Sequence, residues 1–246
     1  MDELILIGIG TGNPDHITRQ GEKALRSADA VLLPRKGKGK ADLAELRLHI
    51  CNSVLGPDAR IIPVDLPVRD ARGDYHQGVI DWHDAIAHAW QEALAAHANP
   101  ARVAMLIWGD PSLYDSSLRI AERLTPKPKV TVIPGITALQ ALTAAHAIPL
   151  NEVNAPVLIT TGRQLRDHGW PDGAETIAVM LDGECSFQTL DPEGIDIWWG
   201  AYLGMENELL ASGPLFKMAG QIVEQRAAAR KAHGWIMDCY LLRRTA

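Results

Sequence analysis

A chain of 246 residues is long enough to bury a sizeable core and suggests one or two domains. Lys and Arg total 24 and Asp and Glu total 30, which gives a formal net charge of −6. This acidic balance argues against a general binder of nucleic acid or anionic membranes, because such proteins carry a basic surplus. The cysteines, Cys51, Cys185 and Cys239, form no CxxC pair, so we expect no disulfide framework and a cytoplasmic location. The histidines include no HExxH motif, so we expect no metal site.

One long uncharged stretch, Val130 to Asn151, raises the question of a membrane span. A span needs about 20 predominantly apolar residues, and this stretch is interrupted by Pro134-Gly135 and Pro149. It reads better as a strand, a tight turn and a buried helix. The acidic start, Met1 to Glu3, lacks the basic region of a signal peptide. We therefore expect no membrane association.

The first half of the chain alternates short apolar runs with helical patterns. Helices are expected at His16–Ser27 and at Tyr75–His97, where Trp82, Ile86 and Trp90 recur at helical spacing and should face the core. Strands are expected at Leu4–Gly8, Ala30–Leu33, Arg60–Val64, Arg102–Trp108 and Lys129–Ile133. Strands separated by helices indicate βαβ units and a largely parallel sheet.

The second half has fewer helices between its strands. Helices are expected at Thr137–His146 and Leu215–Lys231. Strands are expected at Val157–Thr160, Ile177–Leu181, Ile195–Tyr202 and Trp235–Leu242. Strands that follow one another without a crossover helix pair antiparallel. We therefore expect an α/β fold of two domains, a parallel α/β domain over residues 1–135 and a smaller α+β domain with a mixed sheet over 136–246.

Three glycine turns follow predicted strands, at Gly8–Pro14, Trp108–Ser116 and Val132–Ala138. If the sheet is parallel, these turns meet at its carboxyl edge, where open α/β sheets bind ligands. The first turn has Asn13 at the third glycine position of the dinucleotide fingerprint, which disfavours a nicotinamide dehydrogenase. In the second turn, Asp110 suits a cationic or hydroxyl-bearing ligand, or else it caps the next helix.

The segments LIGIGTGNPDHITRQG, MLIWGDPSLYDSS and VIPGITALQALTAAHAIPL, with a weaker echo in TIAVMLDG and AYLGMENELLASG, carry a resemblance to a known family. They resemble the S-adenosylmethionine-dependent tetrapyrrole methylases of cobalamin and sirohaem synthesis. Thr11, Asn13 and Asp115 depart from the usual family pattern. Together with LLPRKGKGK and WWGAYLGMENELLASG, these features resemble the branch that methylates C1 of the corrinoid ring and releases an acetyl fragment.

The resemblance implies two α/β domains with the methyl donor, S-adenosylmethionine, in the cleft between them. It also implies a tetrapyrrole as the small-molecule substrate, and we expect a homodimer. The residues that the resemblance assigns to the methyl donor are Thr11, Trp108, Gly109, Asp110, Leu113, Thr137, Ala138, Leu181, Leu203 and Gly204.

Further candidates come from charge and position. Arg35, Lys36 and Lys38, with Lys40, form a basic cluster after a strand and would suit the carboxylates of a tetrapyrrole, or form an ordinary solvated loop. Asp15, Tyr114 and Asp115, together with His16, are the titratable side chains that the glycine turns bring nearest to a reacting carbonyl. Nothing in the sequence ranks them. Alternatives stay open. Within the family, the chain could methylate another ring position or could be a related protein-modifying diphthine synthase. Outside it, the chain could be a non-catalytic ligand-binding protein of the same fold.

Overall fold

The computed structural model describes residues 1–35, 41–69 and 74–245. The chain forms two compact units, Met1–Ile136 and Thr137–Ala246, which are treated separately below. The first contains a parallel five-stranded sheet and the second a mixed five-stranded sheet. The α/β fold class expected from the sequence is therefore confirmed.

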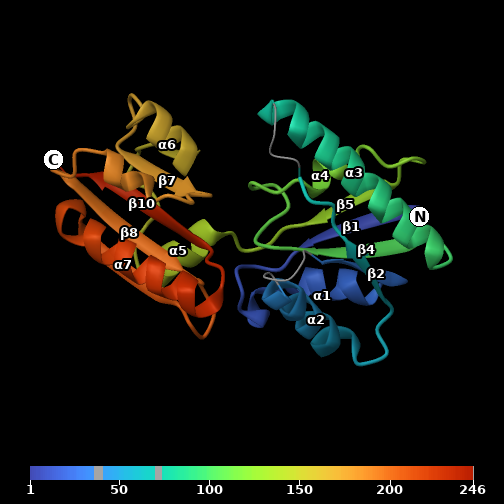
Figure 1. Ribbon diagram of the computed structural model, residues 1–246. Helices are drawn as coiled ribbons and strands as arrows, with labels where there is room; N and C mark the ends of the chain where they lie inside the picture. Colours follow the sequence, from blue (N-terminus) through green and yellow to red (C-terminus); the bar gives the residue numbers. More distant parts are fainter. Residues whose placement is uncertain (36–40, 70–73, 246) are drawn as a thin grey trace. The chain divides into compact units, whose positions relative to one another are not determined.

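The first unit is an open sheet with the strand order β3-β2-β4-β1-β5, in which all the pairings are parallel. Its strands are β1 (Glu3–Gly8), β2 (Ala30–Arg35), β3 (Ile61–Asp65), β4 (Arg102–Ile107) and β5 (Lys129–Ile133). Its helices are η1 (Pro14–His16), α1 (Arg19–Arg26), α2 (Ala41–Leu55), α3 (Tyr75–Ala96) and α4 (Ser117–Ala121). Figure 1 shows α1 and α2 on one face of this sheet and α3 and α4 on the other.

The apolar run of β1 explains this two-sided packing. Successive residues of a strand face opposite sides of the sheet. Leu4 and Leu6 accordingly pack in one cluster with residues of α3 and α4, among them Trp90. Ile5 and Ile7 pack in a second cluster with residues of α1 and α2. Because both faces are covered, the strand is apolar throughout.

Two helices of the first unit differ from the sequence expectation. The segment expected as one helix from His16 to Ser27 contains only the last residue of η1, then the extended residues Ile17 and Thr18, and then α1. Thr18 caps α1, because its hydroxyl accepts a hydrogen bond from the N–H of Gly21 at 2.9 Å. A residue in an N-cap conformation is extended, so the helix begins after it. The long helix α2 was not expected at all.

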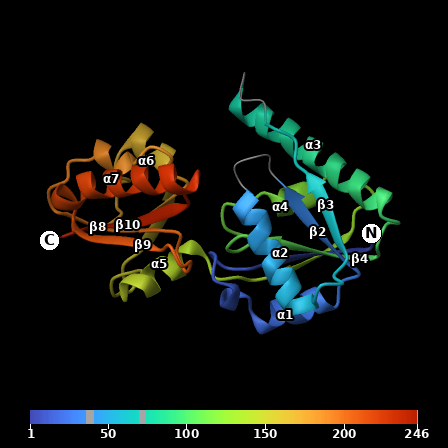
Figure 2. The same cartoon turned by 60° about the horizontal axis from the view of Figure 1, so that its bottom comes forward.

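The second unit is built on a mixed sheet with the strand order β6-β7-β10-β8-β9, in which only β6 and β7 pair in parallel. Its strands are β6 (Val157–Thr161), β7 (Thr176–Met180), β8 (Ile195–Ala201), β9 (Leu209–Pro214) and β10 (Asp238–Arg244). Its helices are α5 (Ala138–His146), α6 (Gly162–His168), η2 (Ser186–Thr189) and α7 (Leu215–His233). Figure 2 shows α6 and α7 over one face of the sheet and α5 over the other.

A buried ion pair fixes α7 on this sheet. Arg226 of α7 donates through Nε to Oδ2 of Asp238 at 2.9 Å, and the indole N–H of Trp199 donates to the same oxygen at 2.9 Å. A second guanidinium nitrogen donates to the carbonyl oxygen of Asp182 at 3.0 Å. Since a buried charge is tolerated only when it is paired, these contacts set the position of α7 along the strands.

Candidate functional site

The three glycine loops of the first unit begin at the same edge of the sheet, because β1 pairs in parallel with both β4 and β5. Gly10 and Gly109 join the first two loops, since each backbone N–H donates to the other residue's carbonyl oxygen, at 3.3 Å and 2.7 Å. Asp110 joins the second loop to the third, because its Oδ2 accepts from the N–H of Gly135 at 2.8 Å. The convergence expected from the sequence is therefore confirmed.

The carboxylate of Asp110 connects two loops by hydrogen bonds. Its other oxygen, Oδ1, accepts from the N–H of Ser112 at 2.8 Å and from the hydroxyl of Ser112. Burial disfavours its charge, but the hydrogen bonds from Ser112 and Gly135 outweigh burial and hold the pKa of Asp110 below its usual value. The alternative that Asp110 caps the next α-helix is wrong, because α4 begins only at Ser117.

Backbone approaches backbone closely where these loops meet. A Cβ atom on Gly135 would lie 2.2 Å from the carbonyl oxygen of Gly109, and one on Gly8 would lie 2.6 Å from the nitrogen of Gly135. No side chain can occupy either position without displacing main chain. The glycines therefore allow the three loops to pack main chain against main chain at this edge of the sheet.

Two polar groups of the first loop are buried without a partner. Among the described residues, the hydroxyl of Thr11 and the Nδ1 atom of His16 have no hydrogen-bond partner. Thr11 is only 4% exposed. Buried polar groups are nearly always satisfied, and an unpaired one costs free energy. An unpaired hydroxyl beside the glycine edge is consistent with a site that is completed by a ligand.

The second loop carries four more candidate residues. Trp108 and Leu113 are half-buried, and neither is locked into a core cluster. Tyr114 has a left-handed backbone with φ of 51° and an exposed side chain, and partial desolvation raises its pKa above the usual value. Asp115 is half-buried and accepts from the N–H of Ser117 at 2.6 Å through Oδ1. Tyr114 thus keeps its proton at neutral pH and is a donor.

The remaining candidate acid of this edge, Asp15, lies on the first loop. Its side chain is exposed, and its backbone N–H donates to Oδ1 of Asn13 at 2.9 Å. The structure thus places Asp15 and His16 on one loop and Tyr114 and Asp115 on the next, and the Gly10–Gly109 bridge joins these two loops. Their side chains are candidates for acid–base work, and geometry does not rank them.

The basic cluster can be described only in part. Arg35, the last residue of β2, forms a two-point ion pair with Asp65 of β3, through Nε at 3.0 Å and Nη2 at 2.9 Å. Both side chains are exposed, so a substrate carboxylate would compete with Asp65 for this guanidinium. Lys36, Lys38 and Lys40 lie outside the described residues.

In the second unit, Thr137 and Ala138 start helix α5. The Thr137 hydroxyl accepts from the N–H of Leu139 at 3.2 Å, and Gln140 returns a contact to the backbone of Thr137, which completes a capping box. The hydroxyl of Thr137 is therefore already used by the helix. Contacts from this position to a ligand would come from the backbone or from the methyl group.

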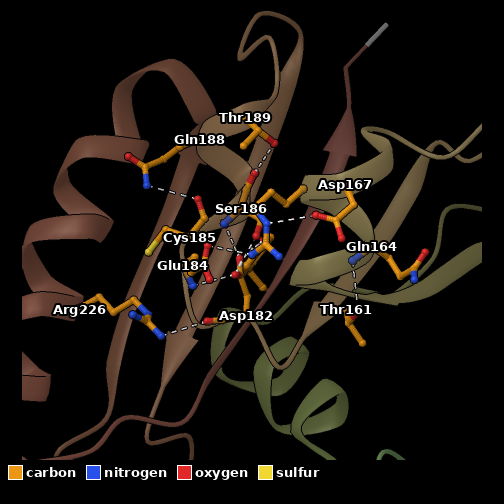
Figure 3. Close-up of polar contacts among 12 residues, drawn as sticks. Thr161, Gln164, Asp167, Asp182, Glu184, Cys185, Ser186, Gln188, Thr189 and Arg226 are labelled. Carbon is orange, nitrogen blue, oxygen red and sulfur yellow. Dashed lines mark hydrogen bonds and ion pairs between the residues drawn. The ribbon is translucent and has the colours of Figure 1, made fainter. Parts of the chain in front are cut away.

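Leu181 stands at the end of β7 with a left-handed φ of 54° and a side chain that is 65% exposed. The next residue, Asp182, is buried and accepts from the N–H groups of Glu184 and Ser186 and from the hydroxyls of Ser186 and Tyr240. Figure 3 shows Asp182 and Ser186 at the centre of these contacts. A fixed turn therefore presents an apolar side chain to solvent, which is the property expected of a ligand-contacting residue.

Leu203 and Gly204 lie in the turn after β8. Leu203 is only 4% exposed and packs against the α-carbon of Gly200, where a Cβ atom would lie 2.6 Å from its Cδ2. Gly204 has a φ of 78°, and its N–H donates to Oε2 of Glu208 at 2.7 Å. The side chain of Leu203 is thus committed to the interior of the unit, and only its backbone is available to a ligand.

Sequence reasoning missed two polar residues that shape these edges, Asp182 and Arg47. Asp182 stands next to a glycine after the end of a strand, as Asp110 does, although the glycine follows Asp182 and precedes Asp110. Arg47 lies in the unexpected helix α2 and donates through Nε to the carbonyl oxygen of Leu106 at 2.9 Å. No local motif marks Arg47, because its partners lie on other elements.

Comparison with known proteins places this arrangement in a family. The family model for tetrapyrrole (corrin/porphyrin) methylases matches residues 3–219. The chain belongs to the tetrapyrrole methylase family. It is 46% identical over 253 aligned positions to a precorrin-6A synthase (deacetylating) from Sinorhizobium, which covers 100% of this chain and 97% of the relative.

Two other relatives bear on the assignment. A precorrin-2 C(20)-methyltransferase from Sinorhizobium is 34% identical but covers only 60% of this chain and 59% of its own length. The crystal structure of a cobalamin-synthesis-related protein, CobF, from Corynebacterium diphtheriae has a TM-score of 0.85 at 38% identity and covers 100% of both chains. The tetrapyrrole methylase resemblance is therefore confirmed along the whole chain.

This tetrapyrrole methylase is a methyltransferase that uses S-adenosylmethionine as its methyl donor, as the resemblance implied. The first unit fits such a ligand on two observations. Gly8, Gly109 and Gly135 let the three loops meet at this edge, and the hydroxyl of Thr11 beside them is buried without a partner among the described residues. The donor carries hydroxyl, amino and carboxylate groups that hydrogen bond with main chain and with such a hydroxyl.

Proposed function

We propose that this tetrapyrrole methylase acts as a precorrin-6A synthase of the deacetylating type. In that reaction, a step of cobalamin (vitamin B12) synthesis, C1 of precorrin-5 is methylated and acetate is released. The observation that carries the proposal is the 46% identity over the full chain to a relative of that name. The relative named for another ring position, C20, covers only 60% of the chain, which favours the deacetylating reaction over methylation at C20.

The substrate sets a chemical requirement. A ring carbon that bears an acetyl group has no free valence for a methyl group. Addition of water to the acetyl carbonyl and cleavage of the carbon–carbon bond give acetate and two protons, and they leave the electron pair on the ring carbon. That pair then forms the new bond to the methyl group. S-adenosylmethionine, when bound, supplies this methyl group on a sulfonium sulfur that is already a good leaving group.

The residues of the chain then have to hold the methyl donor in position. We assign this task in the first unit to Thr11 and to the loop segment from Trp108 to Leu113, which includes Gly109 and Asp110. Asp110 holds the loops together through Ser112 and Gly135 and does not itself need to touch the donor. In the second unit the same proposal assigns contacts to the residues Thr137, Ala138, Leu181, Leu203 and Gly204.

The acetyl group requires a hydrogen-bond donor for its oxygen and a base for water. Tyr114 suits the donor role, because burial raises the pKa of its hydroxyl and keeps it protonated. Asp15 and Asp115 are the proposed bases. Arg35, Lys36 and Lys38 are proposed to bind substrate carboxylates, although Arg35 is engaged with Asp65 in the structure.

Assembly and location complete the proposal. We propose that the enzyme is a homodimer and acts in the cytoplasm, where its three cysteines remain thiols. All three are buried and free in the structure. Among the described residues, no helix combines the length and apolar character that a membrane span requires.

The coupling of methylation to acetate release tests the proposal. Enzyme would be incubated with S-adenosylmethionine and precorrin-5 that carries a 13C-labelled acetyl group. We expect one equivalent of labelled acetate for each methylated product, measured by 13C NMR and mass spectrometry. Omission of the methyl donor is the control. Methylated product that forms without acetate would place the enzyme in another branch of the family.

A further inference from the structure

The first unit contains a cavity that the proposed methyl-donor site does not include. It has a volume of about 150 Å³ and lies at the carboxyl ends of β2 and β4, between helices α2, α3 and α4. Its polar lining includes Arg47, Asp115, Ser116 and Ser117. One lining residue, Asp115, directly follows Tyr114 in the sequence and so belongs to the second glycine loop.

Arg47 is the main charge of this cavity. Its Nε donates to the carbonyl oxygen of Leu106 at 2.9 Å, which fixes the direction of the guanidinium. Within the described ranges, the two terminal nitrogens have neither a hydrogen-bond acceptor nor an ion-pair partner. Burial lowers the pKa of Arg47, while the Asp115 carboxylate raises it, yet a guanidinium stays charged in proteins. A half-buried cation with unused donors favours an anion as its partner.

Further donors surround the guanidinium. Ser116 occupies the N-cap position of α4 but makes no capping hydrogen bond with its hydroxyl. The indole N–H of Trp90, another residue of the lining, is buried and has no acceptor in the part of the chain that the structure describes. Asp115 is the one carboxylate among the described lining residues, and its Oδ1 already accepts from Ser117. The cavity therefore offers donors without an acceptor at Arg47 and Trp90, among the described residues.

The volume restricts the ligand. A cavity of about 150 Å³ is known to hold a molecule of the size of benzene. A carboxylate with one or two carbons therefore fits, whereas a tetrapyrrole ring does not. Trp82, Ile86 and Met105 supply apolar wall for the methyl or methylene end of such a group. The planar fork of Arg47 matches the two oxygens of a carboxylate.

We propose that the Arg47 cavity is a binding site for a short-chain carboxylate. Arg47 holds the two oxygens, Ser116 donates to one of them, and the apolar wall covers the carbon end. Two sources supply this chemistry: free acetate, or an acetate side chain of the tetrapyrrole. The binding of a carboxylate rests on the cavity alone, whereas its part in the reaction rests on the proposed function.

Binding of 13C-methyl acetate to the intact protein, followed by saturation-transfer NMR, tests the site. We expect saturable binding of acetate and none of acetamide, which has the same shape without the charge. Arg47→Met should weaken acetate binding at least about tenfold, because a charge-assisted contact is lost. Arg26→Met, at an exposed arginine of the same unit, is the matched control and should bind as the wild type does.

Kinetic measurements on the same variants separate the two sources. If the ligand is an acetate side chain of the tetrapyrrole, Arg47→Met should raise the KM for the tetrapyrrole at least about tenfold and should change kcat less. If the ligand is free acetate, KM should stay constant, and product inhibition by acetate should disappear. Binding of S-adenosylhomocysteine should be the same in Arg47→Met and in the wild type, which keeps this test apart from the methyl-donor site.

A measurement on the wild-type protein tests the site even if Arg47→Met does not fold. In the wild-type protein, nuclear Overhauser effects should connect the acetate methyl group with indole protons of Trp82 or Trp90. Arg47→Lys, which keeps the charge and loses the fork, should show an intermediate loss. Acetate binding that is equal in Arg47→Met and the wild type overturns the proposal, as does the lack of both acetate binding and a KM effect. A wild-type enzyme that binds acetate at this site but releases none from precorrin-5 overturns the proposed reaction alone.

Discussion

At the scale of single residues, the candidate methyl-donor site depends on carboxylates that bind main chain. Asp110 satisfies the N–H of Gly135, which lies 25 positions further along the chain, and thereby sets the distance between two loops. Asp182 performs the same task in the second unit, where it holds the turn that presents Leu181. A Cβ atom on Gly162 would lie 2.3 Å from Cγ of Asp182, so a glycine is required beside it. Both acids therefore act through the backbone that they position.

The replacement of Asp110 by Asn tests this interpretation. The side-chain amide would direct an N–H group toward the N–H of Gly135 or of Ser112, so one of the two contacts is lost. A hydrogen bond to a charged group contributes about 1.5–3 kcal/mol, and a loss of this size weakens binding about tenfold or more. We expect titration calorimetry to show this loss for S-adenosylhomocysteine.

Asp58→Asn, at an exposed position of the same unit, is the control and should bind as the wild type does. Circular dichroism would verify that Asp110→Asn is folded. Unchanged affinity in the folded variant would remove Asp110 from the machinery of the donor site.

At the scale of elements, the sequence pattern predicts best where burial decides the structure. The strands β1 and β4 are continuous apolar runs that are covered on both faces, and their positions are close to those expected. The elements that were missed include helices α2 and α6 and strand β9. In α6 only Gly162 and Leu165 are buried, and β9 is an edge strand that ends in Gly-Pro. These elements depend on tertiary contacts, and such contacts cannot be predicted from a local sequence pattern.

In the candidate site, too, some features could be predicted from the local sequence and others could not. The glycine loops could be found from the sequence, because a glycine at the end of a strand is a local signal. The bond between Asp110 and Gly135, the capping box that uses the hydroxyl of Thr137, and the burial of Leu203 could not. Each of these depends on which segments the fold brings together. Arg47 is the clearest case, since its role follows from a cavity between three helices.

Helix α3 carries a residue with a testable pH dependence. His83 is 4% exposed, and its Nε2 has no partner among the described residues. Burial lowers its pKa in the folded state, and the nearby charges of Arg123 and Arg119 lower it further. The unfolded chain takes up a proton near pH 6.5, before the folded protein does. The free energy of unfolding should therefore fall as the pH drops below about 6.5, by at most about 1.4 kcal/mol per pH unit for this residue.

Urea unfolding of the wild type and of His83→Gln between pH 5 and pH 8 would measure this dependence. The variant should show a flatter curve below about pH 6.5. His88→Gln, on the same helix but at an exposed position, should retain the slope of the wild type. Parallel curves for the wild type and His83→Gln would show that His83 does not contribute.

At the scale of the whole molecule, charge sets a problem for the proposed substrate. The chain has a formal net charge of −6, and a tetrapyrrole fringed with carboxylates is itself an anion. Attraction must therefore come from local cations, because the average field of the protein is repulsive. The first unit offers Arg47 in its cavity and Arg35 at the end of β2. The segment that follows Arg35 contains Lys36, Lys38 and Lys40.

Two triple variants of equal net charge distinguish local attraction from the average field. Replacement of Lys36, Lys38 and Lys40 by Gln should raise the KM for the tetrapyrrole about threefold to a hundredfold, since each exposed pair contributes about 0.2–1 kcal/mol. Replacement of Lys23, Lys127 and Lys231 by Gln makes the same change in net charge at exposed positions elsewhere, and we expect KM to stay near that of the wild type. Added salt should raise the KM of the wild type and of the second variant, and it should change that of the first variant less, because screening acts on the attraction that the first variant has lost. Equal KM values for the two triple variants would show that the cluster after Arg35 is an ordinary solvated loop and that net charge alone governs the approach of the substrate.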